Sequence, residues 1–428
     1  MAEKEFDFTV FGATGYTGKY VFRNLLGWED IEKKPRKIAI AGRNKDKLES
    51  LLKETALQLD RNLDSIGVII AEVNDEESLL SMCERSKVIL NVCGPYILYG
   101  EQVVRACIQK KAHMVDISGE PQYLEDMQFK YHEAAKKAGV YIVGACGYDA
   151  IPSDVGTDVL KQKFTPGRLN QVDAFVNGKF GSAGVTINIG TLHSLAQAFG
   201  EFNQMLKIRE GYVKGMFKKN LPESRYPAKI RYLPWWDDEV NGWCLPVPIG
   251  DRDIVKNSQR WFHEYNDEKP VQFEEYIVVP KLYHALFLAL GMFYLTILIY
   301  FNFTRKLLIK HPKIFTAGFF SKSGPTRKQL EETSFTFTCV GKGWSEPLNE
   351  GDTDYKSPPN KIIKCRISGP DPGYETTSRC LIQSGLSILD EGDKMPFDGG
   401  CITPAFAFRG TTIRERLTRH NVTFEIIE

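Results

Sequence analysis

The sequence lacks the signals of several common protein classes. Its formal net charge is only +1, and this small charge argues against nucleic acid as the main partner. With 43% hydrophobic residues, the chain is too apolar for a disordered protein. Nine cysteines are scattered without a C-x-x-C pair, which predicts reduced thiols rather than disulfides. No apolar run of the kind found in a signal peptide follows Met1, so we expect a cytosolic location for the first residues.

Several catalytic motifs are also missing. The sequence contains no H-E-x-x-H, no G-x-S-x-G and no P-loop lysine. Dispersed cysteines and only seven histidines predict that there is no metal site. The Tyr-x-x-x-Lys pair of short-chain dehydrogenases occurs once, at Tyr265 and Lys269. With eighteen tyrosines in the chain, we interpret this single match as a coincidence.

The first 146 residues alternate between short apolar runs and longer amphipathic runs. The apolar runs predict strands near 7–11, 37–41, 67–73, 87–92, 113–117 and 140–145. The amphipathic runs predict helices near 16–26, 45–58, 76–85, 100–111 and 122–138. Strands that alternate with helices form a parallel sheet with helices on both faces. We therefore predict an α/β fold that begins with a Rossmann-like domain.

Three glycines, in the spacing G-x-x-G-x-x-G, separate the first predicted strand from the first predicted helix. Such glycines allow a sharp turn, the close approach of a pyrophosphate to the backbone, and tight packing of the helix on the sheet. The alternative is a turn that binds nothing. The residues that we expect to contact a dinucleotide here are Gly12, Ala13, Thr14, Gly15, Tyr16, Thr17 and Gly18.

The end of the second predicted strand favours NADP(H) over NAD(H). An NAD site usually has an acidic residue there, which binds the ribose 2′-hydroxyl. This chain instead has Arg43 and Asn44, followed by Lys45 and Lys47. A guanidinium group with further positive charge suits a 2′-phosphate. The alternative is a solvated basic start of the next helix.

Further cofactor contacts are expected at the ends of the third and fourth strands. Asp75 follows the third strand, and the sequence Cys93-Gly94-Pro95-Tyr96 follows the fourth. The nicotinamide ring of a bound dinucleotide would lie near this second group. Tyr96 could stack on that ring or donate a hydrogen bond, and it could equally be an ordinary loop aromatic.

Several motifs, taken together and in order, resemble the saccharopine dehydrogenase-like oxidoreductase family. They are VFGATGYTGKYV, AGRNKDKL, VILNVCGPY, VDISGE, GYDAIPSDVG and the C-terminal GGCITPAFAFRGTTIRERLTRHNVTFEI. The family includes lipid-droplet-associated animal proteins and the mycobacterial trans-acting enoyl reductases. The resemblance implies an NADP-type Rossmann domain, an inserted α/β substrate or dimerisation domain, and association with lipid droplets. A site for an amino-dicarboxylic acid cannot be traced, so we do not expect saccharopine dehydrogenase activity.

The residues that could carry the chemistry follow the fourth, fifth and sixth predicted strands. A hydride transfer usually needs a proton donor near the nicotinamide. The candidate catalytic residues are Tyr96, Asp116, Glu120 and Asp149. Ser153 and Asp154 lie near Asp149, but their position after a proline is more typical of helix caps. His113 and His193 are interpreted as structural histidines.

An uncharged apolar run of 23 residues, 282–304, is flanked by Lys281, Arg305 and Lys306. It is long enough to span a bilayer, but a single span would separate the cofactor domain from the C-terminal region. We therefore predict a membrane or lipid-droplet hairpin that bends at Gly291 and enters one leaflet. The alternative is a buried core or interface helix.

We predict four parts in the chain. Residues 1–150 form the NADP-binding Rossmann domain and 151–280 an α+β substrate or dimerisation domain. Residues 281–306 form the membrane-associated segment, and 307–428 complete the second domain and pack on the first. A homodimer is compatible with this arrangement.

The expected function is NADP(H)-dependent oxidation or reduction of a lipidic or otherwise apolar substrate. The expected location is a lipid droplet or the cytosolic face of the endoplasmic reticulum membrane. The alternative is a non-catalytic NADP-binding scaffold or a structural lipid-droplet protein, because such a protein would keep the same nucleotide site and the same apolar segment.

Overall fold

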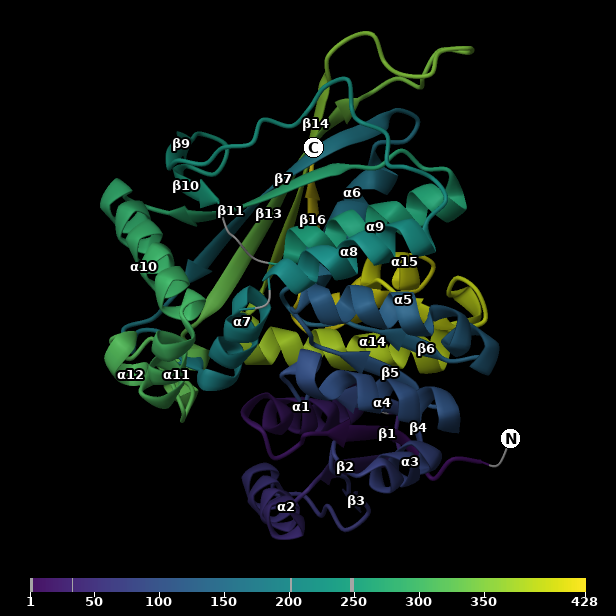
Figure 1. The fold of residues 1–428 in the computed structure, drawn as a ribbon, viewed down its shortest axis with the longest axis vertical. Helices are drawn as coiled ribbons and strands as arrows, with labels where there is room; N and C mark the ends of the chain where they lie inside the picture. The colour runs from purple at the N-terminus through teal and green to yellow at the C-terminus, as the bar shows by residue number, and fades with distance from the viewer. Residues whose placement is uncertain (1–2, 33, 201, 247–249) are drawn as a thin grey trace.

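Two seven-stranded sheets organise the protein in the computed structural model, which describes residues 3–32, 34–200, 202–246 and 250–428. The strand order of the first sheet is β15-β6-β5-β4-β1-β2-β3, and that of the second is β16-β14-β13-β7-β11-β10-β9. Helices lie between the two sheets, and the first sheet is at the bottom of the view in Figure 1. Residues from both ends of the sequence therefore contribute to the region where the sheets meet.

The first sheet is parallel throughout and confirms the predicted α/β fold. Its N-terminal strands are β1 (Phe6–Phe11), β2 (Ile38–Gly42), β3 (Gly67–Ile70), β4 (Ser86–Asn91), β5 (His113–Asp116) and β6 (Tyr141–Val143). The intervening helices are α1 (Tyr16–Glu32), α2 (Lys45–Leu59), α3 (Glu76–Arg85), α4 (Tyr96–Lys110) and α5 (Pro121–Ala138). Alternate residues of the central strands face two hydrophobic clusters, as expected for a sheet that is covered on both faces.

The C-terminal region completes the first sheet, which the sequence patterns did not predict. The strand β15 (Gly400–Ile402) pairs with β6, and α14 (Thr377–Glu391) packs on α1, β4 and β5. Twelve of the fifteen residues of α14 are buried. A Cβ at Gly385 would lie 2.9 Å from the Leu90 side chain and 3.0 Å from that of Phe8, so this glycine allows the helix to approach the sheet closely.

The second sheet is mixed, and β7 lies near its centre. Its strands are β7 (Arg168–Lys179), β9 (Trp235–Asp237), β10 (Gly242–Pro246), β11 (Gln272–Val279), β13 (Ser334–Trp344), β14 (Lys361–Pro370) and β16 (Thr423–Ile427). The strand β7 pairs in parallel with β11 on one side and antiparallel with β13 on the other. The strands β11 and β13, which precede and follow the apolar segment in the sequence, are therefore both hydrogen-bonded to β7.

Helices fill the space between the sheets. They are α6 (Gly156–Lys163), α8 (Phe202–Met216), α9 (Asp251–Asn266) and α15 (Pro404–Phe408). Figure 1 shows α6, α8 and α9 between the second sheet and α5, and α8 contacts α5 directly. The boundaries proposed for the four parts of the chain remain predictions, because each sheet contains strands from distant parts of the sequence.

The apolar segment forms one continuous helix, α10 (Leu282–Tyr300), and the predicted bend at Gly291 is wrong. Nothing lies within 4 Å of a Cβ placed on Gly291, and the residues around it remain helical. A single glycine costs a helix only about 1 kcal/mol, too little to break a long apolar run. The chain turns instead at Phe301 and continues as α11 (Asn302–Lys310) and α12 (Pro312–Phe315).

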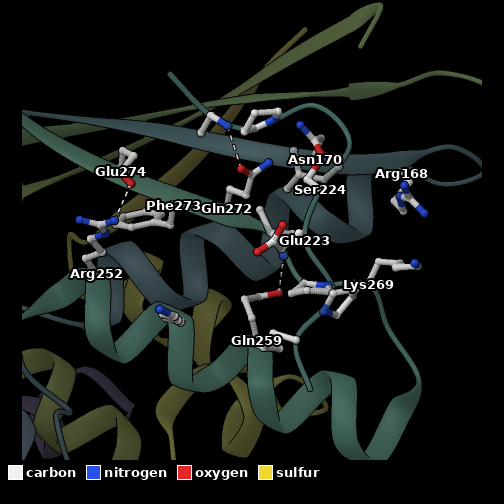
Figure 2. Close-up of a pocket in the computed structure, with 18 of the residues that line it drawn as sticks. Arg168, Asn170, Glu223, Ser224, Arg252, Gln259, Lys269, Gln272, Phe273 and Glu274 are labelled. Atoms are coloured by element: carbon white, nitrogen blue, oxygen red, sulfur yellow. Dashed lines mark hydrogen bonds and ion pairs between the residues drawn. The ribbon is translucent and has the colours of Figure 1, made fainter. Parts of the chain in front are cut away.

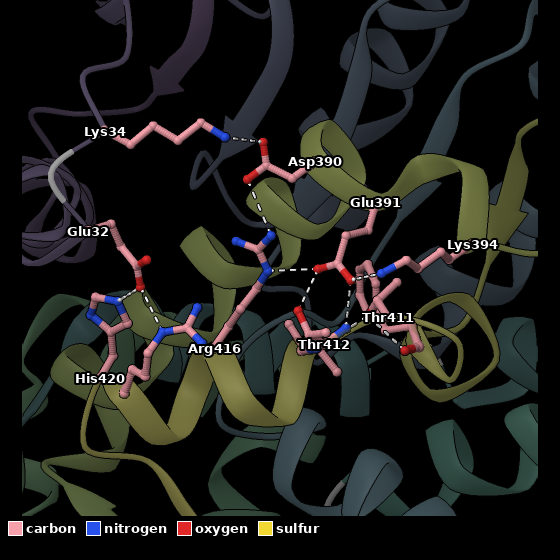
Figure 3. Close-up of polar contacts among 12 residues, drawn as sticks. Glu32, Lys34, Asp390, Glu391, Lys394, Thr411, Thr412, Arg416 and His420 are labelled. Atoms are coloured by element: carbon pink, nitrogen blue, oxygen red, sulfur yellow. Dashed lines mark hydrogen bonds and ion pairs between the residues drawn. The ribbon is translucent and has the colours of Figure 1, made fainter.

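A polar network joins the last helix, α16 (Ile413–Arg419), to α14 (Figure 3). Glu391 accepts hydrogen bonds from the Thr412 hydroxyl at 2.7 Å and from Arg416 Nε at 2.8 Å. Burial acts to raise the pKa of Glu391, but these hydrogen bonds outweigh it and lower the pKa to about 2. Asp390 accepts from Arg36 at 2.5 Å, so the network also reaches the loop before β2.

We predict that Glu391→Gln destabilises the protein at neutral pH. A carboxyl whose pKa falls from 4.5 to about 2 on folding contributes stability above pH 4.5 and loses it as the pH falls towards 2. Urea denaturation at pH 7 should show a loss of about 2–3 kcal/mol, which becomes smaller at pH 3.5. Glu415→Gln, on the exposed side of α16, is the matched control. An equal loss at both pH values would contradict the charge assignment.

Candidate functional site

The loop between β1 and α1 has the shape that a dinucleotide pyrophosphate requires. Gly12 has a φ of +87°, which side chains rarely adopt, and a Cβ there would lie 3.1 Å from the Val92 carbonyl oxygen. A Cβ at Gly18 would lie 2.3 Å from the Gly12 oxygen and 2.8 Å from Ala13 Cα. Only glycine therefore allows this turn and the close approach of α1 to β1. The free N–H groups at the start of α1 remain directed towards the loop.

The loop lies at the point where the strand order reverses. The strands β1 and β4 are neighbours, although they are the first and fourth strands in the sequence. In open parallel sheets, ligands bind at this position beyond the carboxyl ends of the strands. The contact between Gly12 and Val92 brings the loop after β1 beside the loop after β4. Cys93, Gly94 and Pro95 therefore border the same crevice as the glycines.

Arg43 follows β2 at the same edge of the sheet and is exposed. It forms no ion pair with a carboxylate in the described part of the chain, so its guanidinium is available to an anion. Burial raises the pKa of the Cys93 thiol, and the charge of Arg43 acts in the opposite direction. The field of Arg43 therefore reaches the loop after β4. Asn44 caps α2 by accepting from the Lys47 backbone N–H at 2.9 Å.

Several predicted site residues have structural partners. Asp75 caps α3 by accepting from the Ser78 backbone N–H at 3.2 Å. Tyr96 is buried, and its hydroxyl donates to the Asn91 carbonyl at 3.0 Å. Glu120 accepts from the backbone N–H groups of Tyr96 and Ile97 at 3.1 and 2.7 Å, so it holds the start of α4.

Asp116 has a similar structural environment at the end of β5. Its carboxylate accepts from the backbone N–H of Ser118 at 2.9 Å, from that of Ala145 at 3.1 Å and from the Tyr123 hydroxyl at 3.0 Å. Burial raises its pKa to about 6 despite these hydrogen bonds. It therefore joins the loops after β5 and β6 across the edge of the sheet.

Asp149 differs from the other candidates because it belongs to a group of three acidic residues. It follows β6 and is accessible to solvent, and its Oδ2 lies 3.6 Å from the position that a Cβ on Gly119 would take. Desolvation by the surrounding protein raises its pKa. The other two members are Asp251, the first residue of α9, and Glu275, on strand β11 of the second sheet.

Asp251 and Glu275 are both held in an environment that favours the protonated form. Asp251 is 4% exposed, and its Oδ1 has no hydrogen-bond partner among the described residues. Burial raises its pKa, and repulsion from Glu275 and Asp149 adds to this. Burial, followed by repulsion from Asp149, raises the pKa of Glu275 to about 8. Glu275 therefore retains its proton near neutral pH and the surroundings of Asp251 favour its protonated form, so these two buried carboxyls form a candidate proton store beside Asp149.

The sequence interpretation of Ser153 and Asp154 as helix caps is wrong. Both lie inside the helical turn Ile151–Val155, and the Ser153 hydroxyl donates to the Ala150 carbonyl at 3.0 Å. Asp154 accepts from the Ser258 hydroxyl at 2.7 Å and from the Ala405 backbone N–H at 2.8 Å. It therefore connects α9 with α15, and burial raises its pKa to about 7.

The two histidines have different surroundings. His113 Nδ1 accepts from the Tyr141 backbone N–H at 3.0 Å, and burial lowers the pKa of the His113 ring to about 4. It is therefore a satisfied structural residue. His193 lies on α7 (Ile189–Gly200), and its buried Nε2 has no partner within the described ranges. Burial also lowers the pKa of His193, so the ring is neutral at pH 7.

The helix α7 connects the crevice with the apolar segment. Burial raises the pKa of Glu120 and the Ser194 side chain acts in the opposite direction, which places α7 beside the start of α4. On the same helix, Leu192 and Ala196 are fully buried in a hydrophobic cluster with Leu298 of α10 and Leu308 of α11. The crevice edge and the apolar helices are thus joined by one short helix.

A separate cavity of about 300 Å³ lies in the second part of the chain (Figure 2). It is lined by residues from β7, α9, β11 and the segment 221–230, including Asn170, Ser224 and Gln259. Two of its charged residues, Arg252 and Glu274, pair with each other at 2.9 Å. None of its lining residues belongs to the first sheet, so it is distinct from the candidate dinucleotide crevice.

Comparisons with known proteins agree with this geometry. Residues 8–143 match the family described as the saccharopine dehydrogenase NADP binding domain. A saccharopine dehydrogenase-like oxidoreductase of Mus musculus is 36% identical over 99% of this chain and 98% of that protein. The lipid droplet localized protein of Caenorhabditis elegans is 34% identical over 98% of both chains. A trans-acting enoyl reductase of Mycobacterium bovis is 33% identical over 97% of this chain and 96% of that protein.

A solved structure shows the same overall fold. The apo saccharopine dehydrogenase (L-Glu forming) of Saccharomyces cerevisiae superposes with a TM-score of 0.53 and covers 98% of this chain and 99% of that chain. Its sequence identity is 12%, so it supports the fold alone. Together with the matched domain, the glycine loop establishes the first sheet as an NADP(H)-binding domain.

We predict that Arg43→Ala weakens NADPH binding and leaves NADH binding nearly unchanged. Loss of a charge-assisted hydrogen bond to the 2′-phosphate should cost about 1.5–3 kcal/mol, or roughly 10- to 100-fold in the dissociation constant. Calorimetric titration of both coenzymes measures this difference. Lys53→Ala, an exposed cation on α2, is the control. An equal loss for the two coenzymes would show that Arg43 does not contact the 2′-phosphate.

We predict that Glu275→Gln stabilises the protein at alkaline pH. A carboxyl whose pKa rises from 4.5 to about 8 on folding contributes full stability below pH 4.5 and loses it as the pH rises through 8. Glutamine cannot ionise, so the variant should exceed the wild type by roughly 2–4 kcal/mol at pH 9 and be close to it at pH 5. Urea denaturation at both pH values measures the difference, with the exposed Glu77→Gln as control. A difference independent of pH would refute the raised pKa.

Proposed function

Because the chain belongs to the saccharopine dehydrogenase-like oxidoreductase family, we propose that it transfers hydride between NADP(H) and an apolar, lipid-like substrate at a lipid surface. One observation carries the second half of this proposal. The exposed apolar helix α10 packs on α7, and Ser194 of α7 is near enough to Glu120, at the start of α4, to influence its pKa. A substrate dissolved in lipid would therefore be presented close to the cofactor.

The cofactor would lie across the carboxyl edge of the first sheet. Backbone N–H groups of the loop Gly12–Gly18 would hold its pyrophosphate, and Arg43 its 2′-phosphate. Cys93, Gly94 and Pro95 would border the nicotinamide half of the site, because they follow β4. The bound cofactor supplies or accepts the hydride. The protein itself would position the two reactants and transfer a proton.

Asp149 is the best-placed residue for proton transfer. It is accessible, and it lies on the loop after β6 beside the loop after β5. Desolvation raises the pKa of Asp149, and repulsion from Asp149 in turn favours the protonated forms of Asp251 and Glu275. A protonated Asp149 Oδ2 could donate to a developing anion on the substrate, and the two buried carboxyls could replace that proton.

The proposed location is a lipid droplet or the cytosolic face of the endoplasmic reticulum membrane, with residues 282–304 as the attachment. Among the described residues, α10 is long and apolar enough for contact with a hydrocarbon layer, and only three of its nineteen residues are buried. The lipid-droplet name of the nematode relative supports this location. The name of the mycobacterial relative supports a lipid-like substrate.

A non-catalytic NADP(H)-binding scaffold is the second candidate function. Three of the four candidate catalytic residues predicted from the sequence form hydrogen bonds that stabilise the fold. Tyr96 and Glu120 secure the start of α4, and Asp116 joins two loops. A protein that only binds the cofactor would need these residues for the same reasons, so the chemistry depends on Asp149 and its two acidic neighbours.

We predict that the protein oxidises NADPH in the presence of lipid enals, enones or ketones incorporated in phosphatidylcholine vesicles. Asp149→Asn should lower kcat at least tenfold and leave the NADPH dissociation constant unchanged, because proton donation typically contributes 10²- to 10⁴-fold. The decrease in NADPH absorbance measures turnover, and calorimetric titration measures the NADPH dissociation constant. Asp393→Asn, exposed and distant in the sequence, is the control. NADPH binding without turnover of any of these lipids would favour the scaffold.

A further inference from the structure

The charge of the chain is concentrated around the apolar helix. From Tyr276 to Leu330 there are eight lysines and arginines and no aspartate or glutamate, whereas the whole chain has a net charge of only +1. The eight cations are Lys281, Arg305, Lys306, Lys310, Lys313, Lys322, Arg327 and Lys328. The rest of the chain therefore has seven more acidic than basic residues. Such a local excess of cations beside an apolar surface requires an explanation.

The topology of the second sheet restricts how α10 can meet a lipid layer. The strand β11 precedes α10 and the strand β13 follows it, yet both pair with β7. Both ends of the intervening segment therefore lie on the same side of any membrane. A helix of nineteen residues would be about 28 Å long, close to the thickness of a bilayer core. It cannot cross that core, because the chain would have to return to the same sheet.

Both ends of α10 are also fixed to the protein. Near its start Ala285 is fully buried, and the helix contacts β10 and β11 there. Near its end Leu298 and Ile299 are buried in the cluster that includes Leu192 of α7. Figure 1 shows α10 extending from the edge of the second sheet to α11 and α12. The helix therefore lies along the body of the protein and does not project from it.

The exposed face of α10 is apolar along its length except at His284 and Thr296. Its exposed large side chains recur at intervals of three or four residues, as expected for one face of a helix. They are Leu282, Tyr283, Leu286, Phe287, Leu290, Phe293, Tyr294, Ile297 and Tyr300. Phe287 is 80% exposed and Tyr300 is 74% exposed. The same surface continues through Phe303 and Ile314, so it extends well beyond one helix.

Cations without a partner border this apolar face. Lys306, Lys310 and Lys313 are exposed, and within the described residues they form no ion pair with a carboxylate. By contrast, Arg327 and Lys328 pair with Glu331 and Glu332. The unpaired cations of α11 and α12 follow the exposed aromatic residues of α10 in the sequence, and Lys281 and Lys322 likewise form no ion pair within the described residues.

We propose that residues 281–319, here called the lipid platform, dock in the plane of an anionic phospholipid surface. The apolar face of α10 would enter the boundary between headgroups and acyl chains, and the cations of α11 and α12 would contact anionic headgroups. A phospholipid surface offers apolar depth and negative charge together, which matches both features of the platform. This inference rests on the lipid-surface part of the proposed function and is independent of hydride transfer.

Vesicle flotation of the full-length chain tests the charge component. Vesicles of phosphatidylcholine with 30% phosphatidylserine should bind the protein at least tenfold more tightly than pure phosphatidylcholine, and 0.5 M KCl should remove that difference. The triple variant Lys306→Glu, Lys310→Glu, Lys313→Glu should lose the preference. The control carries Lys53→Glu, Lys137→Glu and Lys163→Glu, which exchange three exposed lysines elsewhere. Equal binding to both vesicles would overturn the role of the cations.

Fluorescence depth measurements test the in-plane orientation. Eight of the nine cysteines are buried and Cys93 is half-buried, so single labels can be attached to cysteines introduced in a Cys93→Ser background. Labels at Phe287, Leu290, Tyr294 and Ile297 should show similar shallow depths when quenched by brominated lipids. A depth that increases steadily along the helix would demonstrate a spanning orientation and overturn the proposal.

Self-association is the other outcome to be distinguished. If the wild-type chain fails to float with either vesicle and forms dimers that Phe287→Ser with Phe293→Ser dissociates, the platform is an interface between copies of this chain. That result would contradict lipid docking. Flotation does not depend on turnover, so a protein that floats but fails to oxidise NADPH with lipid substrates would contradict only the proposed reaction.

Discussion

The pairing of β7 with β11 on one side and with β13 on the other is the constraint on which most of the structure depends. The strand β11 precedes the apolar segment and β13 follows it. Because both pair with β7, the chain must leave and re-enter the second sheet on the same side of the protein. The strand β11 also carries Glu275, which the pairing places opposite the loops of the first sheet. One arrangement of three strands therefore positions both the exposed apolar helix and the acidic group beside Asp149.

The two sheets are interlocked by elements from the C-terminal region of the chain, and this holds the elements around the candidate crevice in place. The C-terminal α14 lies against β4 and β5, and β15 extends the first sheet beside β6. After contributing these elements, the chain returns to the second sheet as β16, which pairs with β14. The network around Glu391 joins the final helix to α14. A motion that opened the crevice would therefore have to act against contacts from both ends of the chain.

Local patterns predicted the first sheet well, because its strands and helices alternate along the sequence. The glycine loop was recognised for the same reason, and Arg43 was nominated because it too occupies a fixed place in a strand–turn–helix unit. The partners of α14 and β15 were not predictable, because they depend on contacts between residues more than 250 positions apart. Asp251 and Glu275 were missed likewise, although two adjacent glutamates in a strand whose second half is apolar were a signal of a special environment. Gly291 was overinterpreted, because a glycine weakens a helix without ending it.

We propose a hydride transfer between soluble NADP(H) and a substrate held in lipid. The most direct measurement uses NADPH deuterated at C4 of the nicotinamide, added to the full-length protein with vesicles made from a total lipid extract. Mass spectrometry of the recovered lipids should reveal a species that gained one deuterium, in step with the NADPH consumed. If the protein is saturated with NADPH and no lipid acquires the label from either C4 deuteromer, the account is contradicted.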